Sequence, residues 1–513
     1  MNPLGDIPGH WELIVIGGGI TGAGVFDEAV RRGWRTLLLE RRDFAWGTSS
    51  RSSKLVHGGL RYLKQGQLGL MRQAVKEREY LLETIPDLVS PIHFTVPVFK
   101  DIGPGRLALE TGLSIYDMVA GRWQHRYLDL AETQARLPGL RAEALMGAFT
   151  FTDAQTDDAR LVLHLIGEGL RAGGSALNYT MVERIRRDHR GDVTGIVAMD
   201  SETGHRRTLT AAGVINATGV WAETIHPAPV KNGHIRPLRG SHLIFPSRLI
   251  PLSTALSFVH PSDHRSMFII PWEGATLVGT TDVDHHGDLS TEPTVSIEEA
   301  RYLLNGVRFI FPGLRIETED ALSSFAGVRP VLSHGGRAPS DESREHRVWA
   351  EHRLVTVTGG KLTTFRRLAA DALAKAAHDL PPETPDAPAP AAEAPPEAIS
   401  VDTAHLRRLV ARFGFKAARR MADTHRELLA PVPGTATLWA ELALAAETEQ
   451  IRHLDDLLLR RVRIGLLLPD GARGHLRQIK AVCQSRLGWN DERWLQETAA
   501  YTALWNRAYA PPT

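Results

Sequence analysis

Glycines near the start of the chain have the spacing of a dinucleotide-binding site. Gly17, Gly19 and Gly22 fit the pattern G-x-G-x-x-G, and Gly18 stands within it. The first glycine permits a tight turn, the second lets a pyrophosphate approach the backbone, and the third lets a helix pack closely on a strand. Glu40 lies where a carboxylate can accept hydrogen bonds from ribose hydroxyls. Because this carboxylate disfavours a ribose 2′-phosphate, the pattern indicates FAD or NAD rather than NADP.

A later apolar segment favours FAD over NAD. The sequence GVINATGVWA at 213–222 is an apolar run that ends in Ala-Thr-Gly. Such a strand returns the chain to the nucleotide in many flavoproteins that contain two dinucleotide-binding motifs. Gly219 therefore joins the candidate cofactor residues. A buried strand followed by a turn would explain the same segment without a ligand, and a glycine-rich turn would explain 17–22.

These residues require a particular order of elements. Residues 12–17 and 36–40 are short apolar runs typical of buried strands, and 23–32 between them has a helical pattern. Further helices are expected at about 67–84, 157–172 and 294–310. Residues 240–282 form short alternating apolar and polar segments bounded by Pro and Gly, which predicts antiparallel strands. Residues 355–365 repeat the pattern of strand, glycine and helix.

The C-terminal part of the chain is predicted to be a separate helical domain. Seven of the sixteen residues at 381–396 are proline, which indicates an extended linker. In the following sequence, Ile451, Leu454, Leu458 and Val462 are spaced to share one face of a helix. We therefore expect an α/β fold with a discontinuous Rossmann-type FAD-binding domain, an antiparallel-sheet substrate or cap domain, a linker and a helical domain. The expected ranges are 1–90, 150–238 and 331–378 for the first, 91–149 and 239–330 for the second, 379–400 for the linker and 401–513 for the last.

Composition excludes several classes of protein. The 513 residues include 60 Lys and Arg against 59 Asp and Glu, so no overall positive field indicates a nucleic-acid partner. The single cysteine, Cys483, excludes a disulfide framework and favours a reducing cytoplasm. The longest stretch without a charged residue has only fifteen residues, 208–222, so no membrane-spanning helix is expected. The N-terminus does not have the pattern of a secretory signal.

Several motifs together carry a resemblance to a known family. GGGITGAG, the sequence GTSSRSSKLVHGGLRYLKQG at 47–66 and NATGVWA at 216–222 are followed by RGSHLIFP at 239–246, FAGVRPV at 325–331 and GGKLTTFRRLAADAL at 359–373. In this order they resemble the FAD-dependent, aerobic, quinone-linked glycerol-3-phosphate dehydrogenases, from about residue 10 to 375, and 403–513 resembles that family's helical domain. Phe365 departs from the family, which often has tyrosine there. The sizeable insertion usual in the related oxygen-using oxidases is absent, which favours the quinone-linked branch.

The resemblance implies a reaction and the residues that perform it. The reaction is oxidation of sn-glycerol 3-phosphate to dihydroxyacetone phosphate by hydride transfer to flavin N5, with electrons passed to a quinone. A phosphate dianion requires cationic donors, and the family's phosphate-binding residues match Arg61, Tyr62, Arg329 and Lys361. His57 is the favoured proton acceptor, since an imidazole titrates near neutral pH, and His242 is its rival. The predicted catalytic set is His57, Arg61, Arg329 and Lys361, and the predicted substrate-binding set is Arg61, Tyr62, His242, Arg329 and Lys361.

The predicted FAD site extends beyond the glycine loop. Serine, threonine and lysine donors at 48–54 are expected to line the flavin and its phosphates, and GGKLTT to open a helix whose N-terminus points at the flavin pyrimidine edge. The complete cofactor set is Gly17, Gly18, Gly19, Gly22, Glu40, Thr48, Ser49, Ser50, Ser53, Lys54, Gly219, Gly360, Leu362 and Thr363. No metal site is predicted, because a polar turn explains the run from Asp282 to His286 and the reaction needs no metal.

Other functions stay open at this stage. The same fold could serve a glycerol-3-phosphate oxidase that uses oxygen, or a flavin amine or hydroxy-acid oxidoreductase whose arginines bind a carboxylate. A nucleotide-binding scaffold without catalysis is the non-enzyme alternative. A quinone acceptor predicts peripheral association with the inner face of the cytoplasmic membrane, and the basic stretch 401–430 could contact anionic lipid or be a solvated helix face. A homodimer is also left open.

Overall fold

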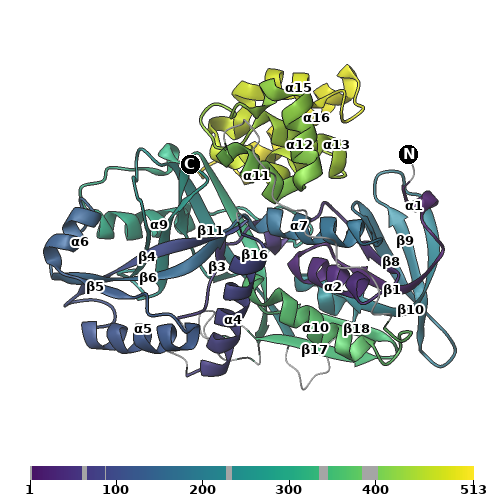
Figure 1. Cartoon of the computed structure of the whole chain (residues 1–513), viewed down its shortest axis with the longest axis horizontal. Coiled ribbons are helices and arrows are strands. Elements are labelled where there is room, and N and C mark those ends of the chain that lie inside the picture. The colour runs from purple at the N-terminus through teal and green to yellow at the C-terminus, as the bar shows by residue number, and fades with distance from the viewer. Residues whose placement is uncertain are drawn as a thin grey trace.

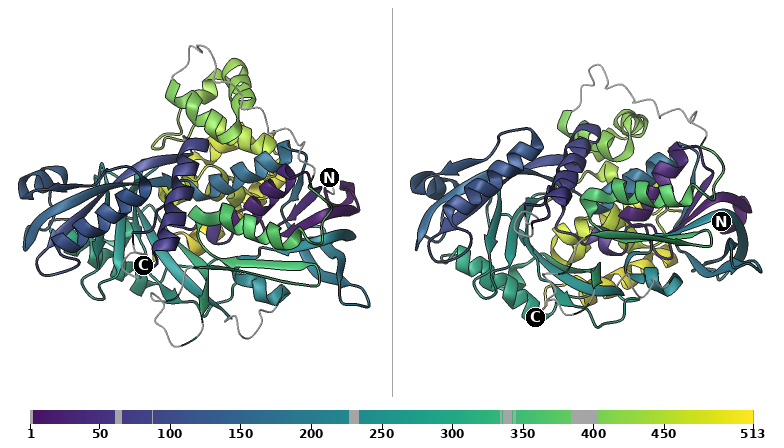
Figure 2. Two further views of the ribbon diagram at one scale, coloured as in Figure 1. Left: turned by 60° about the horizontal axis from the view of Figure 1, so that its bottom comes forward. Right: turned by 90° about the horizontal axis from the view of Figure 1, so that it is seen from below.

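The computed structural model describes residues 3–60, 66–86, 88–226, 234–333, 335, 342, 345–383 and 403–512. Two β-sheets with their helices form the body of the molecule, residues 3–383, and the helical domain, residues 403–512, packs on one side of it (Figure 1). Two further views in Figure 2 show that the helical domain lies against both halves of the body.

The first sheet is the expected Rossmann-type sheet. Strand β1 lies between β2 and β10, β2 also pairs with β7, and β10 also pairs with β18, all in parallel register. Antiparallel strands β8, β9 and β17 extend it. The bounds are β1 His10–Ile16, β2 Thr36–Leu39, β7 Ser175–Leu177, β8 Thr180–Arg187, β9 Val193–Asp200, β10 Arg206–Asn216, β17 His346–Glu351 and β18 Leu354–Gly359.

Both faces of the first sheet are buried, as the unbroken apolar runs of its strands require. Leu13 and Val15 of β1 pack with helices α2 (Ile20–Arg31), α7 (Asp158–Arg171) and α10 (Phe365–Ala376) on one face. Ile14 and Ile16 point to the opposite face, where the β8–β9 hairpin covers them. This alternation fixes the register of β1, because a slip by one residue would exchange the two faces.

The second sheet is mostly antiparallel, as predicted from the Pro and Gly residues that interrupt 240–282. Strand β16 pairs along its whole length with β11, and β4 pairs with β6 and, in parallel, with β12. The bounds are β3 Leu55–Val56, β4 Val89–Phe99, β5 Arg126–Leu128, β6 Leu145–Thr156, β11 His234–Pro246, β12 Ala255–Val259, β13 Ser266–Trp272, β14 Ala275–Gly279, β15 Val283–Asp284 and β16 Ser323–Ser333. Its helices are α4 Leu68–Thr84, α5 Arg106–Ala120, α6 Leu130–Arg136 and α9 Ile297–Ile310.

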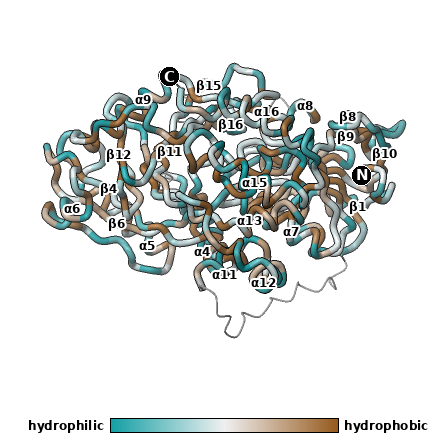
Figure 3. The backbone as a smooth tube through the Cα atoms, turned by 90° about the horizontal axis from the view of Figure 1, so that it is seen from above, coloured by the Kyte–Doolittle hydropathy of each residue, from teal (hydrophilic) through white to brown (hydrophobic). Residues whose placement is uncertain are grey.

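The helical domain consists of helices packed around a hydrophobic centre. They are α11 Thr403–Phe413, α12 Phe415–Thr424, α13 Trp439–Thr448, α14 Ile464–Leu467, α15 Leu476–Cys483 and α16 Asp491–Ala508. In Figure 3 the hydrophobic colours gather around α13 and along β1, while the outer loops are hydrophilic. Nearly all side chains of α13 are buried, which makes it the central helix of the domain.

The predicted amphipathic helix over 451–462 is wrong. The segment from Asp456 to Arg461 forms a π-helix, and Arg463 then adopts a left-handed conformation with φ 61°. Leu457 and Arg460 would both lie off the apolar face of the expected helix, yet they are as buried as Leu458. The segment is sandwiched between the rest of the helical domain and the body, so it has no solvent face.

The predicted fold class is confirmed, and most expected elements lie within a few residues of their predicted bounds. Helix α9 begins later than expected because Ser296 caps it, accepting a hydrogen bond from the Glu299 N–H. Residues 384–400 of the predicted linker lie outside the described residues, and the predicted domain boundaries stay a prediction. Among the described residues, no helix combines the length and apolar character needed to span a bilayer.

Candidate active site

A cavity of about 1930 Å³ opens between the two sheets. Its nucleotide end is formed by the glycine loop, by residues 46–53 and by the turns that follow β10 and β18. Its other end is formed by β4, α5, β12 and β13 of the second sheet. The first end follows the C-terminal edge of parallel strands, which is where sheets of this kind bind ligands.

The glycine loop has the geometry that its spacing predicts. Gly17 has φ 108°, and a Cβ there would lie 2.7 Å from the Ala217 carbonyl oxygen. A Cβ on Gly22 would lie 1.8 Å from the Gly17 carbonyl oxygen, so any side chain would push α2 away from β1. Gly19 caps α2 without a side chain of its own. The Ser49 hydroxyl accepts a hydrogen bond of 2.9 Å from the Ile20 N–H, the first donor of α2.

Glu40 joins the glycine loop to the end of β2. Its carboxylate accepts hydrogen bonds from the Gly18 N–H at 2.7 Å and from the Arg42 N–H at 2.9 Å. Burial raises the pKa of this carboxyl, against the effect of the two backbone donors. Glu40 lines the cavity, so its remaining lone pairs face the position that ribose hydroxyls are expected to take.

Two more turns complete the nucleotide end. Gly219 has φ 61°, and its carbonyl oxygen accepts a hydrogen bond of 3.0 Å from the Thr358 hydroxyl, which ties the turn after β10 to β18. Gly360 has φ 73°. A 3₁₀ turn, Leu362–Thr364, then leads into α10, so GGKLTT does open a helix as predicted.

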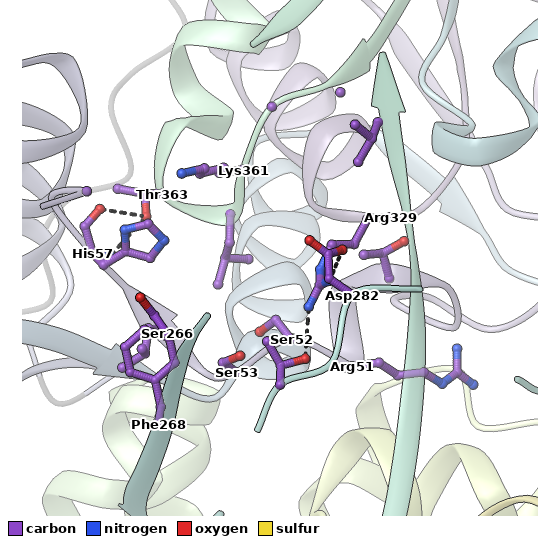
Figure 4. A pocket seen from close by; sticks show the side chains of 18 of the residues that line it. Arg51, Ser52, Ser53, His57, Ser266, Phe268, Asp282, Arg329, Lys361 and Thr363 are labelled. Carbon is purple, nitrogen blue, oxygen red and sulfur yellow. Dashed lines mark hydrogen bonds and ion pairs between the residues drawn. The ribbon is translucent and has the colours of Figure 1, made fainter. Parts of the chain in front are cut away.

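Residues from distant parts of the chain meet along the cavity wall (Figure 4). The His57 N–H donates to the Thr363 hydroxyl at 3.1 Å, although the two residues are 306 positions apart. Lys361 lies next to them in Figure 4. Thr48, Ser49, Ser53 and Leu362 also line the cavity, as predicted from the sequence.

Arg329 lies on the wall opposite His57. It comes from β16, and its side chain is 26% exposed. Its guanidinium donates to the Asp282 carboxylate at 3.1 Å and to the Thr280 hydroxyl at 3.0 Å. Asp282 also lies 3.5 Å from Arg265. These contacts hold one side of the guanidinium against the turn after β14, and the residue lines the cavity.

Besides Gly18 and Gly22 of the glycine loop, three predicted site residues do not line the cavity. Lys54 is completely buried, and its ammonium group donates to both Asp158 oxygens, at 2.8 and 2.9 Å, and to the Ser50 carbonyl at 2.7 Å. Burial and the neighbouring Arg463 lower the pKa of Lys54 to about 7. Lys54 and Ser50 therefore lie behind the cavity wall. The sequence SSRSSK by itself gives no sign of which donor groups face the cavity and which are buried behind it.

His242 is the third of these predicted residues that lie behind the cavity wall. It is fully buried, stacks on Phe325 with ring centres 4.7 Å apart, and lies 2.9 Å from the Ser53 hydroxyl through Nε2. Burial, with Arg329 and Lys54 nearby, lowers the pKa of His242 well below its ordinary value. His242 therefore does not face the cavity itself, and it contacts Ser53, which does.

Other predictions have different outcomes. Arg61 and Tyr62 lie outside the described residues. Sequence reasoning missed Arg265, Ser266 and Phe268, which line the cavity from β13 and the turn before it. Their positions depend on the pairing of β13 with β12 and β14, and no motif marks them.

The acidic and histidine run at 282–286 is engaged with arginines. Asp282 pairs with Arg329, and Asp284 forms a two-point contact with Arg236 at 2.6 and 2.7 Å. In the described part of the chain no group of three His, Cys, Asp or Glu side chains could hold a metal ion.

The nucleotide end fits a dinucleotide with two phosphates. The backbone N–H groups at the start of α2, the positive end of that helix and the absence of side chains at 17–19 leave a cradle that a Cβ would fill. Glu40 stands at the ribose position, and the cavity continues past His57 toward the second sheet. A flavin dinucleotide requires such an extended site.

Comparison with known proteins gives the family. A family model described as "FAD dependent oxidoreductase" matches residues 12–366. The chain belongs to this family. FAD is therefore its cofactor, as predicted, and the glycine loop, Glu40 and the 357–363 turn are the residues that would hold it. A second family model, "C-terminal domain of alpha-glycerophosphate oxidase", matches 355–494.

Individual relatives of this FAD-dependent oxidoreductase agree with the resemblance seen in its motifs. The chain is 36% identical over 368 residues to an aerobic glycerol-3-phosphate dehydrogenase of Staphylococcus aureus, a match that spans 71% of this chain and 66% of the relative. A solved glycerol-3-phosphate dehydrogenase of Bacillus halodurans, complexed with FAD, is 27% identical with a TM-score of 0.75, covering 97% of this chain and 95% of the other.

A third similar structure shares only the fold. It is an L-α-glycerophosphate oxidase of Mycoplasma pneumoniae with FAD bound, 17% identical, with a TM-score of 0.57 over 72% of this chain and 95% of the other. The resemblance to glycerol-3-phosphate dehydrogenases is confirmed by the Bacillus structure, whose match covers 97% of this chain and so includes most of the helical domain.

Proposed function

We propose that the protein oxidises sn-glycerol 3-phosphate to dihydroxyacetone phosphate. The observation that carries this proposal is the meeting of Arg329, Lys361 and His57 on one cavity, from three segments far apart in the sequence. Two cations suit a phosphate dianion, and an imidazole suits the proton of a secondary alcohol. The names of the Staphylococcus and Bacillus relatives support the same substrate.

Each residue has a distinct task in this proposal. Arg329 and Lys361, with Arg61 and Tyr62, bind the phosphate and so orient the hydroxyl-bearing carbon. His57 accepts the hydroxyl proton, and its position is set by the hydrogen bond from its backbone to Thr363. FAD, when bound, supplies the hydride acceptor. Ser53, oriented by the buried His242, offers a hydroxyl to the substrate side of the cavity.

Anaerobic mixing of the purified yellow protein with glycerol 3-phosphate tests the substrate. The flavin absorbance should bleach, while glycine and other amines should leave it unchanged. Bleaching by an amine or a 2-hydroxy acid alone would replace this proposal with one of the other oxidoreductases that share the fold.

We propose a quinone as the electron acceptor. A lipid-soluble acceptor requires an apolar approach to the flavin, and the cavity is lined by apolar side chains of β4, α5 and β12. Oxygen remains a second candidate, because the model matching 355–494 is named after an oxidase. Rapid peroxide formation in air, with no reduction of an added short-chain quinone, would favour oxygen.

Peripheral association with the inner face of the cytoplasmic membrane belongs to the same proposal. Large apolar side chains are exposed on α5 and just after it: Leu107 is 79% exposed, and Met118 and Trp123 are each 69% exposed. Ala108 and Ile115 of the same helix line the cavity, so lipid contact here would bring a quinone close to it. The protein should sediment with anionic vesicles, and replacing Leu107, Met118 and Trp123 with serine should release it.

A further inference from the structure

The helical domain supplies no side chain to the cavity within the described residues, yet it contacts the segment that forms one cavity wall. This segment, the 41–54 loop, connects β2 to β3 and contributes Trp46, Gly47, Thr48, Ser49, Ser52 and Ser53 to the wall. Its conformation is mostly irregular, with one 3₁₀ turn at Thr48–Ser50. A loop of this kind needs contacts from outside itself to hold a single shape.

Arginines of the helical domain make those contacts. Arg463 donates to the Ser50 carbonyl at 2.7 Å and to Asp158 at 3.1 Å. The Ser50 carbonyl also accepts from Lys54, so it receives two cationic donors from within the protein. Asp158 also accepts from the Ser52 N–H at 2.9 Å, and so fixes the loop on both sides of Arg51.

The first part of the loop is held in the same way. The Arg461 guanidinium donates to both oxygens of the Asp43 carboxylate, at 2.6 and 2.7 Å, and Arg460 donates to the same group. Asp43 and both arginines are at most 1% exposed. A two-point arginine contact fixes direction as well as distance, so the start of the loop is oriented by the helical domain.

A tyrosine holds the middle of the loop. Arg51 donates to the Trp46 and Gly47 carbonyls, Glu292 accepts from it, and its guanidinium also donates to the Tyr509 hydroxyl at 3.1 Å. Tyr509 in turn donates to Glu292 at 3.2 Å. Trp46 and Gly47 are cavity residues, so this chain of contacts leads from the end of the helical domain to the wall itself.

The backbone conformation of Arg463 is consistent with a specific role for its side chain. Its left-handed conformation, φ 61° and ψ 0°, costs about 1–2 kcal/mol for a residue with a side chain. Glycine would adopt it without that cost. The side-chain contacts with Ser50 and Asp158, both outside the helical domain, give a reason for arginine at this position.

We infer that Arg463 and Tyr509 are positioning residues for the FAD site, and that the helical domain sets FAD affinity by fixing the 41–54 loop. Ser49 of this loop caps α2 at the glycine loop, and Thr48 and Ser53 face the cavity, so a displaced loop would loosen several cofactor contacts together. The inference depends on FAD as the cofactor and not on the proposed substrate.

A titration of FAD into full-chain apoprotein, monitored by flavin fluorescence well below the melting temperature, tests this inference. Arg463→Met should weaken FAD binding about 10-fold, because it removes charge-assisted hydrogen bonds to the loop. Arg463→Lys should recover part of the affinity, since it keeps the charge but not the fork. Tyr509→Phe removes one hydroxyl in a site of unchanged shape, and about a 3-fold loss is expected.

Two matched controls separate positioning from general stability. Arg408 pairs with Glu273 and Glu441, away from the loop, and Tyr501 donates to the Gly471 carbonyl inside the helical domain. Arg408→Met and Tyr501→Phe should lower the melting temperature without changing FAD affinity. Unchanged FAD affinity in both folded Arg463→Met and Tyr509→Phe would overturn the inference, as would equal losses in the controls. Because no glycerol 3-phosphate is used, the result is independent of the proposed reaction.

Discussion

The cavity and the junction between body and helical domain use the same residue types in different ways. At the cavity, Arg329 is about one quarter exposed and one side of its guanidinium rests on Asp282. At the junction, Arg460, Arg461 and Arg463 are at most 1% exposed and end on carboxylates and carbonyls. An arginine beside open space can exchange partners with a ligand, whereas a sealed arginine can only hold what it already contacts. The charge of an arginine therefore says little about its function here, and the exposed fraction of its side chain decides between the two roles.

Within the junction, the Asp43 contacts should respond to mutation mainly through stability. Asp43→Ala leaves Arg460 and Arg461 buried without their shared carboxylate, which should cost about 3–5 kcal/mol of unfolding free energy. Burial alone would raise the pKa of Asp43, but Arg461 and Arg460 outweigh it and hold the pKa well below its usual value. Urea unfolding measures the loss. Asp423→Ala, which removes an exposed pair with Arg419, should change stability by no more than about 0.5 kcal/mol.

The cavity should respond mainly through catalysis. If Arg329 binds the substrate phosphate, Arg329→Ala removes about 1.5–3 kcal/mol of charge-assisted hydrogen bonding, or roughly 10- to 150-fold in kcat/KM for glycerol 3-phosphate. Arg329→Lys should recover only part, since a point charge cannot replace a fork. The flavin spectrum should stay intact. Equal losses on glycerol and on glycerol 3-phosphate would show instead that Arg329 supports the turn at Asp282.

Ser49 lies where the two regions meet, and its effect should be smaller. Ser49→Ala removes the acceptor for the first N–H of α2, which should cost about 1 kcal/mol of stability, as for the loss of an N-cap. Ser49→Thr keeps the hydroxyl and should restore it. Thermal unfolding of the two variants side by side provides the measurement. No difference between them would mean that water replaces the hydroxyl at this helix end.

A histidine at the edge of the junction should have an effect that depends on pH. Burial alone would lower the pKa of His453, but hydrogen bonds to Glu202 and Glu497 outweigh it and raise the pKa to about 10. Because the folded pKa is raised, the stabilisation is complete below the ordinary value of 6.5 and is lost as the pH rises through about 10. The melting temperatures of the parent and His453→Gln should therefore differ at pH 6 and converge above pH 10. A constant difference across that range would contradict the assignment.

Local spacing was enough to predict the nucleotide end of the site. Gly17, Gly19, Gly22 and Glu40 lie within one strand, helix and strand unit, so their geometry follows from short-range rules of backbone conformation. His57, Arg329 and Lys361 came instead from a resemblance to known sequences, and the fold brings them to one cavity. Lys54 and His242 were misplaced because a residue type does not reveal whether its side chain turns to the cavity or behind it.

The sequence by itself determined the α/β class, the dinucleotide loop and the separate helical segment, because these depend on periodicity and on the backbone freedom of glycine. Only the tertiary structure decided what the Arg460, Arg461 and Arg463 cluster does. Its partners Asp43, Ser50 and Asp158 lie about 300 to 420 positions away in the sequence. A run of arginines resembles a solvated helix face until the fold buries it, and the burial of a charge is possible only where distant carboxylates and carbonyls surround it.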